Sequence, residues 1–412
     1  MRLLYLNHNV VHTGTFVRAA HLARELASAG HEVTLVTTHS TGRLRGAERE
    51  WCGVRIIEAP DLLPGAARNG WDGWNTAWRV RRLAAERFDL VHAFDSRPAV
   101  ILPALAVHRR CAAPLVMDWA DWWGRGGTIE ERSGWAVRTF FGPVETWFEE
   151  AFRRSATAHT VIADSLRERC IGLGAAADRV TWLPNGCTPP AEHGAPAQAE
   201  ARAQLGLPDG PLVLHLGVAF PADAEFLFAA FRRVRLAVPD ARLALVGRFA
   251  SLIPADLAGA VVRTGFVDDA TLRLWLAAAD AGVLVLRDTI ASRGRWPGKL
   301  SDYLSGGVPI AMPAVGPAAT RLGRAGAALL SDPTPVALGE AVLRLLDEPE
   351  TRSRLAANSH ALAVGELAWA TVARRLMDFY EDCGIAGMRP TRASSTPAHA
   401  AVAPAPGGAA AT

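Results

Sequence analysis

The chain has 412 residues, a formal net charge of +3 at pH 7 and a hydrophobic fraction of 50%. This length and composition predict two or three domains with large cores. The dispersed basic residues argue against a nucleic-acid-binding protein, and five widely spaced cysteines without a CxxC pair predict neither a disulfide framework nor a structural zinc.

The N-terminal apolar run, residues 1–6, becomes polar at Asn7 and is shorter than a signal peptide. The longest later apolar run, Ala99–Val107, is about half a membrane span and contains a proline. We therefore expect a cytoplasmic protein, which also suits the unpaired cysteines. Peripheral contact with the inner face of the membrane remains the alternative.

Short apolar runs alternate with longer amphipathic stretches, the pattern of β-α-β units around a parallel sheet. Gly14 precedes a predicted helix over Thr15–Ala29, and Thr188–Pro196 has the composition of a linker. The expected strands before the linker are Leu3–Asn7, Glu32–Thr37, Val54–Glu58, Leu90–Ala93, Leu115–Asp118, Ala158–Ile162 and Arg179–Leu183; those after it are Leu212–Leu216, Arg242–Val246, Val261–Thr264, Gly282–Leu286 and Val308–Met312; a helix over Glu366–Asp382 follows.

The predicted fold class is α/β, with two doubly wound Rossmann-like domains facing each other across a cleft. We expect these domains over residues 1–190 and 191–365, a helix over 366–384 that packs back on the first domain, and a disordered Ala/Pro/Gly-rich tail over 387–412. Ligands of such sheets bind at the carboxyl ends of the strands, so the cleft is the expected site.

The segment after the first strand, Asn7–Phe16, lacks the GxGxxG pattern, so a nicotinamide-dependent dehydrogenase is a poor candidate. Gly14 before a helix leaves N–H groups that could meet an acceptor hydroxyl, although a plain tight turn explains it equally well. His12 is a candidate base by its position, with a solvated loop histidine as the alternative.

The segment Met117–Gly127 brings two carboxylates and three tryptophans to the end of a predicted strand. Trp119 and Trp122 are expected to bind the acceptor, because indole faces pack on sugar C–H surfaces or aliphatic chains. Asp118 and Asp121 are the candidate catalytic carboxylates. Core packing with helix-capping aspartates is the alternative, and the spacing does not resemble a metal-binding pair.

Another aromatic cluster, Trp71, Trp74 and Trp78, falls on one face of a predicted helix beside three arginines. Such a helix could lie on anionic lipid. Burial in the core is the commoner outcome for an aromatic stripe, so membrane contact is the minority interpretation.

Lys299 is the only lysine, since the other 43 basic side chains are arginines. A lysine is a compact point charge suited to a phosphate in a tight site. Arg295 precedes it and Asp302 follows it, and Pro297 is placed to begin a helix with Lys299 in its first turn. This group predicts a diphosphate-sugar site; chance survival of one surface lysine is the alternative.

Three predicted strands of the second half end in Gly217, Gly247 and Gly265. Glycine at a strand end lets a phosphate approach the backbone closely. We expect Gly217, Arg248 and Phe266 to belong to the same donor site as Lys299.

Together these motifs resemble the GT-B-fold glycosyltransferases of the retaining family-4 type, over nearly all of residues 1–384. The segments that carry the resemblance are Arg18–Ala23, Gly30–Thr34, Leu183–Gly186, Leu243–Gly247, Ala278–Asp280 and Asp302–Pro309.

The resemblance implies that Asp302 holds the ribose hydroxyls of the donor. The partner carboxylate of the family falls on Gly294 here, and Val218–Ala224 lacks the usual Arg and Lys. Arg295 and Lys299 are expected to replace those cations. The family's acceptor-side histidine falls near Asp118 or Asp121.

The resulting hypothesis is a metal-independent transferase that moves a sugar, with retention, from a nucleoside diphosphate sugar to a hydroxyl acceptor. It needs no cofactor besides this co-substrate. One rival is an inverting transferase with His12 or Asp118 as the base. Another is a catalytically inactive sugar-nucleotide-binding or glycan-binding protein.

Overall fold

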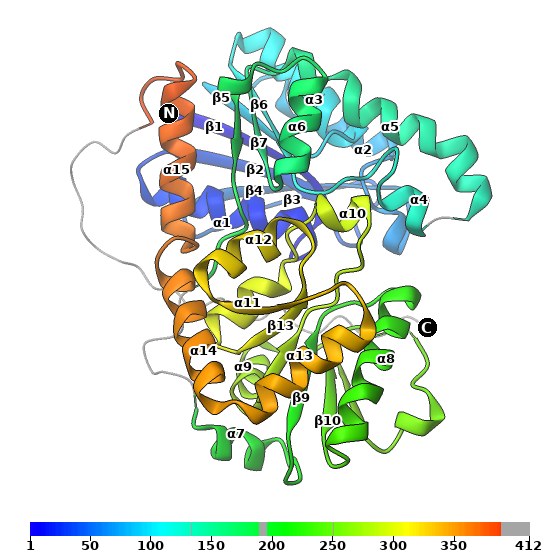
Figure 1. Cartoon of the computed structure of the whole chain (residues 1–412). Coiled ribbons are helices and arrows are strands. Elements are labelled where there is room, and N and C mark those ends of the chain that lie inside the picture. The colour runs from blue at the N-terminus through cyan, green and yellow to red at the C-terminus, as the bar shows by residue number, and fades with distance from the viewer. Residues whose placement is uncertain (133, 189–195, 250, 389–412) are drawn as a thin grey trace.

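The computed structural model describes residues 1–132, 134–188, 196–249 and 251–388. It contains an eight-stranded sheet and a six-stranded sheet, each in its own domain (Figure 1). Buried apolar side chains form clusters on the faces of both sheets, and one cluster joins the two domains, from Val161 and Leu166 to Leu212 and Leu300. The predicted pair of Rossmann-like α/β domains is confirmed.

The first sheet has the strand order β3-β4-β2-β1-β5-β6-β7-β8, and it is parallel except for the β3–β4 pair. The chain leaves β1 toward β2 on one side and returns to β5 on the other, so the topological switch point lies between β1 and β5. Its strands are β1 (Arg2–Val10), β2 (Glu32–Thr38), β3 (Ala47–Trp51), β4 (Val54–Ala59), β5 (Leu90–Phe94), β6 (Leu115–Trp119), β7 (Ala158–Val161) and β8 (Val180–Trp182); the helices are α1 (Thr15–Ser28), α2 (Gly73–Leu83), α3 (Pro98–Cys111), α4 (Thr128–Arg132), the π-helix η2 (Val137–Phe141), α5 (Gly142–Ala151) and α6 (Asp164–Gly172).

The second sheet is parallel in the order β11-β10-β9-β12-β13-β14. Its strands are β9 (Leu212–Leu216), β10 (Arg242–Val246), β11 (Val261–Gly265), β12 (Ala281–Val283), β13 (Ile310–Pro313) and β14 (Ala328–Ser331); the helices are α7 (Gln198–Gln204), α8 (Pro221–Ala237), α9 (Asp269–Ala278), α10 (Ile290–Arg293), α11 (Lys299–Ser305), α12 (Gly316–Ala325), α13 (Pro335–Asp347) and α14 (Pro349–Val364).

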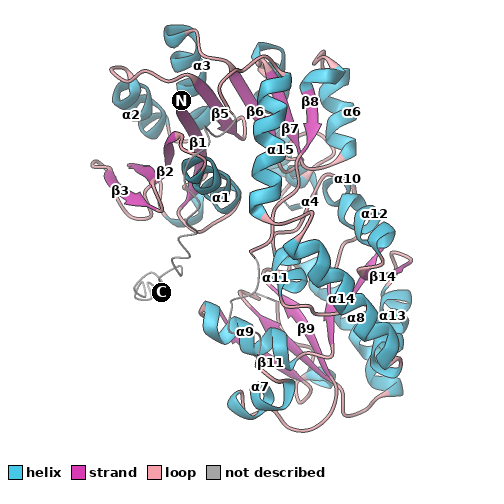
Figure 2. Cartoon of the chain, turned by 90° about the vertical axis from the view of Figure 1, so that its left-hand side faces the viewer, coloured by secondary structure: helices cyan, strands magenta, loops and turns pink. Residues whose placement is uncertain are grey.

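The last helix, α15 (Trp369–Asp382), returns from the second domain to the first and lies beside its sheet (Figure 2). Leu376 belongs to the same buried cluster as α1 and β1. The hydroxyl of Tyr380 lies 3.0 Å from that of Tyr5 and 2.6 Å from Nδ1 of His92. A polar network and an apolar contact therefore both hold α15 on the first domain.

The expected strands lie within three residues of the observed ones at each end. The edge strand β3 was not predicted, because its charged side chains are exposed and give no apolar pattern. The short strand β14 was also missed. The prediction that Pro297 begins a helix is wrong: α11 begins at Lys299, and the carbonyl of Pro297 accepts a hydrogen bond from the N–H of Leu300.

Two predicted segments fall largely outside the described residues, namely the linker over 188–196 and the tail over 387–412. Met388, at the start of the expected tail, is fully buried, and its carbonyl oxygen lies 3.1 Å from Nε2 of His31. The packed part of the chain therefore extends beyond residue 387, which corrects that boundary.

We expect Leu376→Ala to lower the free energy of unfolding by about 2–5 kcal/mol, because it removes buried contacts between α15 and the first domain. Urea unfolding followed by circular dichroism would measure the change. Val364→Ala is the control, since Val364 is 45% exposed at the end of α14. Equal losses in both variants would contradict the role of α15 in this core.

Candidate functional site

The first half of the site lies at the carboxyl ends of β9, β10 and β11. These strands end at or beside Gly217, Gly247 and Gly265, whose φ angles are 84°, 119° and 72°. A Cβ on Gly247 would come within 2.9 Å of the Cα of Gly217. Only glycine therefore allows these neighbouring strand ends to approach. The N–H groups of Gly217 and Gly247 already donate to the carbonyls of Val246 and Gly265, so what these glycines offer a ligand is space.

Lys299 lies directly beside these glycines. Its Nζ is 3.4 Å from Nε2 of His215, and Nδ1 of His215 is 3.3 Å from the carbonyl oxygen of Val283. Because a carbonyl only accepts, we assign the imidazole hydrogen to Nδ1, which leaves Nε2 to accept from Lys299. Burial and the charge of Lys299 lower the pKa of His215 well below its usual value. A neutral imidazole thus orients the ammonium group.

Burial also lowers the pKa of Lys299 to about 8, an effect that Asp223 opposes and Arg295 reinforces. The side chain is therefore still largely cationic at neutral pH. A bound phosphate would stabilise the charged form further.

Asp302 lies three residues after Lys299, on the same helix. Burial, aided by the nearby charge of Asp269, raises the pKa of its carboxyl group to about 7. Within the described residues, no hydrogen bond or ion pair to this carboxylate is found. A half-buried acceptor without a protein partner is suited to the hydroxyl groups of a ligand.

Arg248 and Phe266, both predicted to contact the donor, lie together at the ends of β10 and β11. The guanidinium carbon of Arg248 is 5.3 Å from the centre of the Phe266 ring, and Phe266 is 74% exposed. An exposed cation–π pair of this kind offers a flat surface on which a nucleobase can stack.

Arg295 connects the second domain to the first. Its Nε lies 3.3 Å from Oδ1 of Asp121, and its Nη2 lies 3.4 Å from Oγ1 of Thr128. Beside it, a Cβ on Gly294 would come within 3.0 Å of the Cβ of Trp122. The first domain therefore crowds position 294, where the resemblance predicts a carboxylate.

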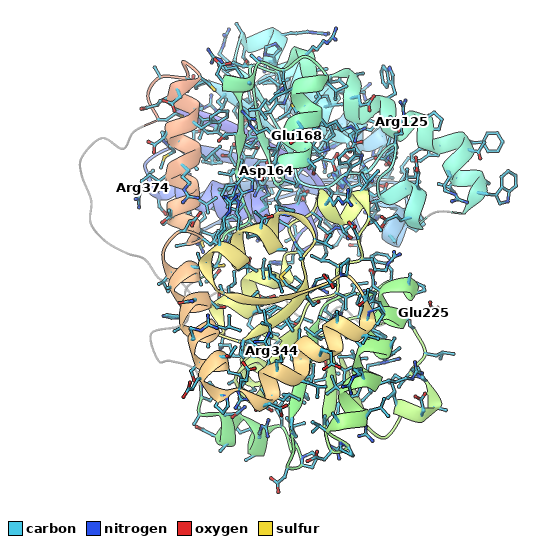
Figure 3. The ribbon with its side chains drawn as sticks, viewed as in Figure 1. Arg125, Asp164, Glu168, Glu225, Arg344 and Arg374 are labelled. Carbon is cyan, nitrogen blue, oxygen red and sulfur yellow. The ribbon has the colours of Figure 1, made fainter. Side chains whose placement is uncertain are left out.

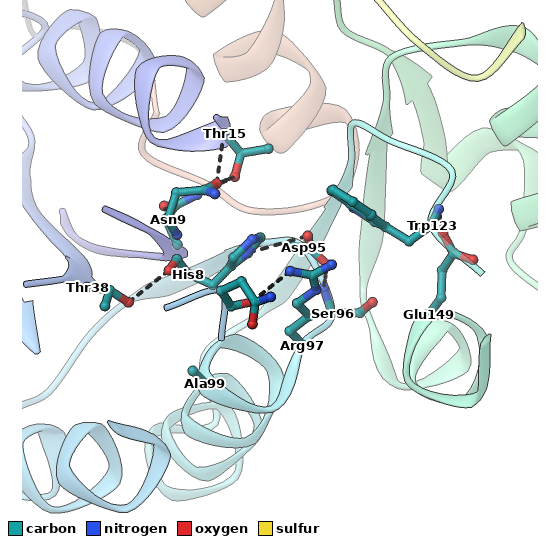
Figure 4. Close-up of polar contacts among 12 residues, drawn as sticks. His8, Asn9, Thr15, Thr38, Asp95, Ser96, Arg97, Ala99, Trp123 and Glu149 are labelled. Atoms are coloured by element: carbon teal, nitrogen blue, oxygen red, sulfur yellow. Dashed lines mark hydrogen bonds and ion pairs between the residues drawn. The ribbon is translucent and has the colours of Figure 1, made fainter. Parts of the chain in front are cut away.

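The second half of the site is a small cavity of the first domain, at the switch point between β1 and β5. It has a volume of about 10 Å³, enough for about one water molecule. Figure 4 shows the surrounding side chains, with Trp123 pointing toward Asp95 and Arg97. The lining includes Thr15, Asp95, Ser96, Asp121, Trp123 and Glu149.

Asp95 is strained, because its φ angle of 91° lies in a region that non-glycine residues rarely adopt. Its Oδ1 accepts a hydrogen bond of 2.5 Å from the N–H of Ser96, and its Oδ2 lies 3.4 Å from Nδ1 of His8. Burial lowers the pKa of His8 to about 3, so this imidazole is neutral. No local motif in the sequence marks Asp95, because it stands alone after the buried strand β5.

Two glutamates of α5 form the wall behind the cavity. Glu145 lies 3.2 Å from Nε of Arg97, and burial raises the pKa of its carboxyl group to about 7. The Arg97 guanidinium lies 4.4 Å from the centre of the Trp123 ring. Glu149 accepts hydrogen bonds from the N–H groups of Trp123 and Gly124. These contacts hold the tryptophan-containing loop against α5.

Two of the expected roles in this loop need correction. Asp118 borders the cavity, but its carboxylate accepts from Nε and Nη2 of Arg18 and from the hydroxyl of Thr160, so it has a structural role rather than that of a base. Trp119 is 2% exposed, with the Arg153 guanidinium 4.0 Å from its ring centre, and cannot offer a face to an acceptor.

Trp122 is half-buried, and the Arg169 guanidinium lies 4.3 Å from its ring centre. It packs between the domains beside Gly294, so its ring serves the interface. Trp123, which was not assigned a role from the sequence, lines the cavity with a half-buried side chain, whereas Trp119 borders it with almost no exposed surface.

Gly14 and His12 also differ from expectation. A Cβ on Gly14 would come within 2.7 Å of the Asn9 side chain, and Asn9 Oδ1 accepts from the N–H of Thr15. The space beside Gly14 is therefore filled by Asn9 and not open to an acceptor. His12 lies on the exposed turn after β1, 5.9 Å from the Phe16 ring, and does not line the cavity.

Trp71, Trp74 and Trp78 are not exposed as a stripe. Trp71 precedes α2 and meets the ring of Phe148 edge-on at 5.1 Å, and Trp74 and Trp78 are half-buried. Arg79 is fully buried and donates to backbone carbonyls. These contacts agree with the favoured interpretation that these tryptophans pack in the core, and not with the minority interpretation that α2 lies on lipid.

A separate cleft of about 310 Å³ opens between the two domains and is lined by Asp164, Ser165, Asp288, Arg293 and Thr320, among others. It contains none of the predicted site residues. Over the ranges that the structure describes, no three His, Cys, Asp or Glu side chains are grouped as metal ligands.

Asp302 should make stability depend on pH. Its pKa rises from 3.8 to about 7 on folding, so the native state binds an extra proton between these values and stability falls as pH rises through them. In Asp302→Asn this contribution is absent, so the variant should gain stability relative to wild type from about pH 4 to 7. Urea unfolding across this range, with the exposed Asp209→Asn as control, would measure it; parallel curves for all three proteins would refute the shift.

The strain at Asp95 can be measured with two variants that both lack the carboxylate. Asp95→Gly should be more stable than Asp95→Ala by about 1 kcal/mol, because only the alanine keeps a Cβ at positive φ. Thermal and urea unfolding would give the difference. An alanine variant as stable as the glycine variant would show that the backbone is not strained here.

Comparison with known proteins identifies both halves of the chain. Residues 13–186 match the glycosyl transferase 4-like domain, and residues 210–348 match the glycosyl transferases group 1 domain. The sequence finds no significant match among curated proteins.

Several solved structures share the fold. The sucrose-phosphate synthase of Thermosynechococcus elongatus has a TM-score of 0.72 and 17% identity, covering 94% of this chain and 100% of that one. WaaG, a glycosyltransferase of lipopolysaccharide biosynthesis, and Anabaena Alr3699/HepE in complex with UDP-glucose each have a TM-score of 0.66 and 16% identity, covering 92% of this chain and 99% of theirs. The chain therefore belongs to the glycosyltransferases of the GT-B fold, with a glycosyl transferase 4-like domain followed by a group 1 domain.

Proposed function

We propose that this glycosyltransferase takes a sugar from a nucleoside diphosphate sugar held by its second domain and passes it to a hydroxyl acceptor in the first. The observation that carries the proposal is Lys299, the lone lysine, placed beside Gly217 and on the same helix as the unpartnered carboxylate of Asp302. The HepE complex with UDP-glucose supports a UDP-sugar as the first donor to test.

In this proposal each donor contact has a separate role. Lys299 binds the diphosphate, Asp302 accepts from the ribose hydroxyls, and the Arg248–Phe266 pair stacks on the base. Gly217 has no side chain beside Lys299, which leaves room for a phosphate there.

Arg295 is the second cation that we assign to the diphosphate. It is held by Asp121 across the cleft, so donor binding would exchange a carboxylate for phosphate oxygens at the same guanidinium. Two cations near the leaving group can stabilise the developing charge without a metal ion.

We place the acceptor hydroxyl beside Asp95, between His8 and Trp123. Because the cavity there holds about one water molecule, an acceptor sugar requires the two domains, or the tryptophan-containing loop, to move apart. The acceptor class remains a glycan, a glycolipid or a small molecule, and the proposed location is the cytoplasm.

Transfer with retention is part of the proposal. The bond between the anomeric carbon and the phosphate oxygen breaks, the acceptor oxygen bonds to the same face, and the leaving phosphate takes the acceptor proton. The inverting alternative lacks support from Asp118, which is paired to Arg18, and from His12, which lies on an exposed turn. The anomeric configuration of the product, read by NMR, distinguishes the two.

Lys299→Met should weaken binding of UDP-glucose by about 10- to 100-fold, because it removes a charge-assisted contact of about 1.5–3 kcal/mol. Isothermal titration calorimetry would measure the affinity. The control is Arg344→Met, which removes an exposed cation on α13 (Figure 3).

Two outcomes would count against the proposal. Unchanged affinity in Lys299→Met would remove the lysine from the donor site. Donor binding by the wild type without transfer or donor hydrolysis would instead favour a sugar-nucleotide-binding protein, the alternative suggested by the crowding of Gly294 by Trp122.

A further inference from the structure

The helical segment after α4 carries an exposed apolar stripe. Val137, Phe140, Val144 and Trp147 recur at intervals of three and four residues, which places them on one face of a helix. Phe140 is 73% exposed and Trp147 is 55% exposed, and the preceding Trp135 is 70% exposed. We call these five residues the aromatic stripe.

The inner face of the same segment is already packed. Phe148 and Phe141 both contact the ring of Trp71, at 5.1 Å and 4.6 Å between ring centres. The segment is therefore apolar on its outside as well as its inside. A helix of that kind is normally covered on both faces.

Its charges are distributed unevenly. The three carboxylates of α5 are paired with the protein: Glu145 with Arg97, Glu149 with backbone N–H groups, and Glu150 with Arg169 at 2.6 Å. Between residues 137 and 151 this leaves Arg138 as the exposed charged side chain. The outer face is therefore apolar and cationic.

Arg125 adds a second cation beside this segment. Its backbone N–H donates to the hydroxyl of Thr146 on α5. Arg125 is exposed on the same side of the first domain (Figure 3).

The stripe lies on the outside of the wall of the acceptor cavity. Glu149, on the inner face of α5, lines that cavity, whereas Val144 and Trp147 of the same helix face outward. In Figure 1 the segment around α4 and α5 forms the edge of the first domain. Whatever covers the stripe is thus held next to the acceptor cavity.

We infer that the aromatic stripe docks on a lipid bilayer with anionic headgroups. Trp and Phe side chains partition into the interfacial region, and Arg138 and Arg125 complement the headgroup phosphates. No helix of the described residues is long and apolar enough to span a membrane, so this contact would be peripheral. Because Glu130 and Glu131 are also exposed, we expect apolar insertion to contribute more than charge.

The inference replaces α2 with η2 and α5 as the membrane-facing element. It goes beyond the proposed function, because binding to lipid does not require that a donor bind or a sugar move. If both proposals hold, the docked enzyme presents its acceptor cavity beside the headgroup layer.

Flotation with vesicles of phosphatidylcholine and phosphatidylglycerol would test the inference. The variant Trp135→Ser/Phe140→Ser should lower the partition coefficient by at least about tenfold, because two large apolar side chains no longer insert. Arg138→Glu should weaken binding to these vesicles but not to pure phosphatidylcholine. Leu236→Ser and Leu252→Ser, which remove apolar side chains 80% and 90% exposed elsewhere, should leave binding unchanged.

Three results would overturn the inference. The first is absence of vesicle binding by the wild type, and the second is equal binding by the stripe variant. The third is a wild-type protein that sediments as a dimer and a stripe variant that sediments as a monomer, while neither protein binds vesicles. Titration of the same proteins with UDP-glucose keeps the two proposals separate. If the wild type does not bind UDP-glucose, the proposed function is refuted, and the flotation result by itself still decides this inference.

Discussion

The buried ion pair between Arg18 and Asp118 is the interaction on which the rest of the structure depends. Nε and Nη2 of Arg18 donate to the two carboxylate oxygens of Asp118, which are 3.1 and 2.9 Å away. The remaining donors reach the carbonyl oxygens of Leu183 and Pro184 at 2.8 and 2.7 Å. One guanidinium thereby joins α1, the end of β6 and the start of the connection to the second domain. Two buried charges are stable here because hydrogen bonds satisfy both of them.

This ion pair also connects more distant parts of the molecule. Thr160 donates to Asp118, and His92 lies between Thr160 and the hydroxyl of Tyr380 on α15. On the other side, Asn185 accepts from Arg18 and donates to the carbonyl of Trp296 in the donor loop. Helix α15 and the loop that contains Trp296 are thus linked through Asp118, the carboxylate that the sequence predicts to be catalytic. Its burial supports domain alignment instead of chemistry.

The two halves of the site are built differently. The proposed donor half has glycine-ended strands and one oriented lysine, so we expect its ligand contacts to come from α11 and from the space that the missing side chains leave. The acceptor half is closed, with Asp95 strained, and Glu145 and Glu149 held in the wall. The ion pair between Arg295 and Asp121 joins the two halves, so the domains are closed at this point. Because the cavity holds about one water molecule, we expect the domains to open before an acceptor can enter.

Much of the fold follows from local patterns. Alternating apolar runs located the buried strands, because each strand and its covering helix are encoded by neighbouring residues. Terminal glycines located the donor edge, and the loss of every other lysine singled out Lys299. The edge strand β3 could not be found in this way, because its polar residues pair with β4 through backbone bonds alone.

The sequence by itself therefore determined the fold class, the glycine-ended donor strands and the lysine that we assign to the diphosphate. Only the tertiary structure decided which carboxylates face the cleft and which aromatic stripe is exposed. Asp118 pairs with Arg18, which lies 100 residues away in the sequence. Asp95 has a positive φ angle and lies beside His8, which belongs to another strand. Likewise, Trp71 is covered by Phe141 and Phe148, whereas Trp135 is 70% exposed. Burial and pairing depend on residues far apart in the chain, and local periodicity carries no information about them.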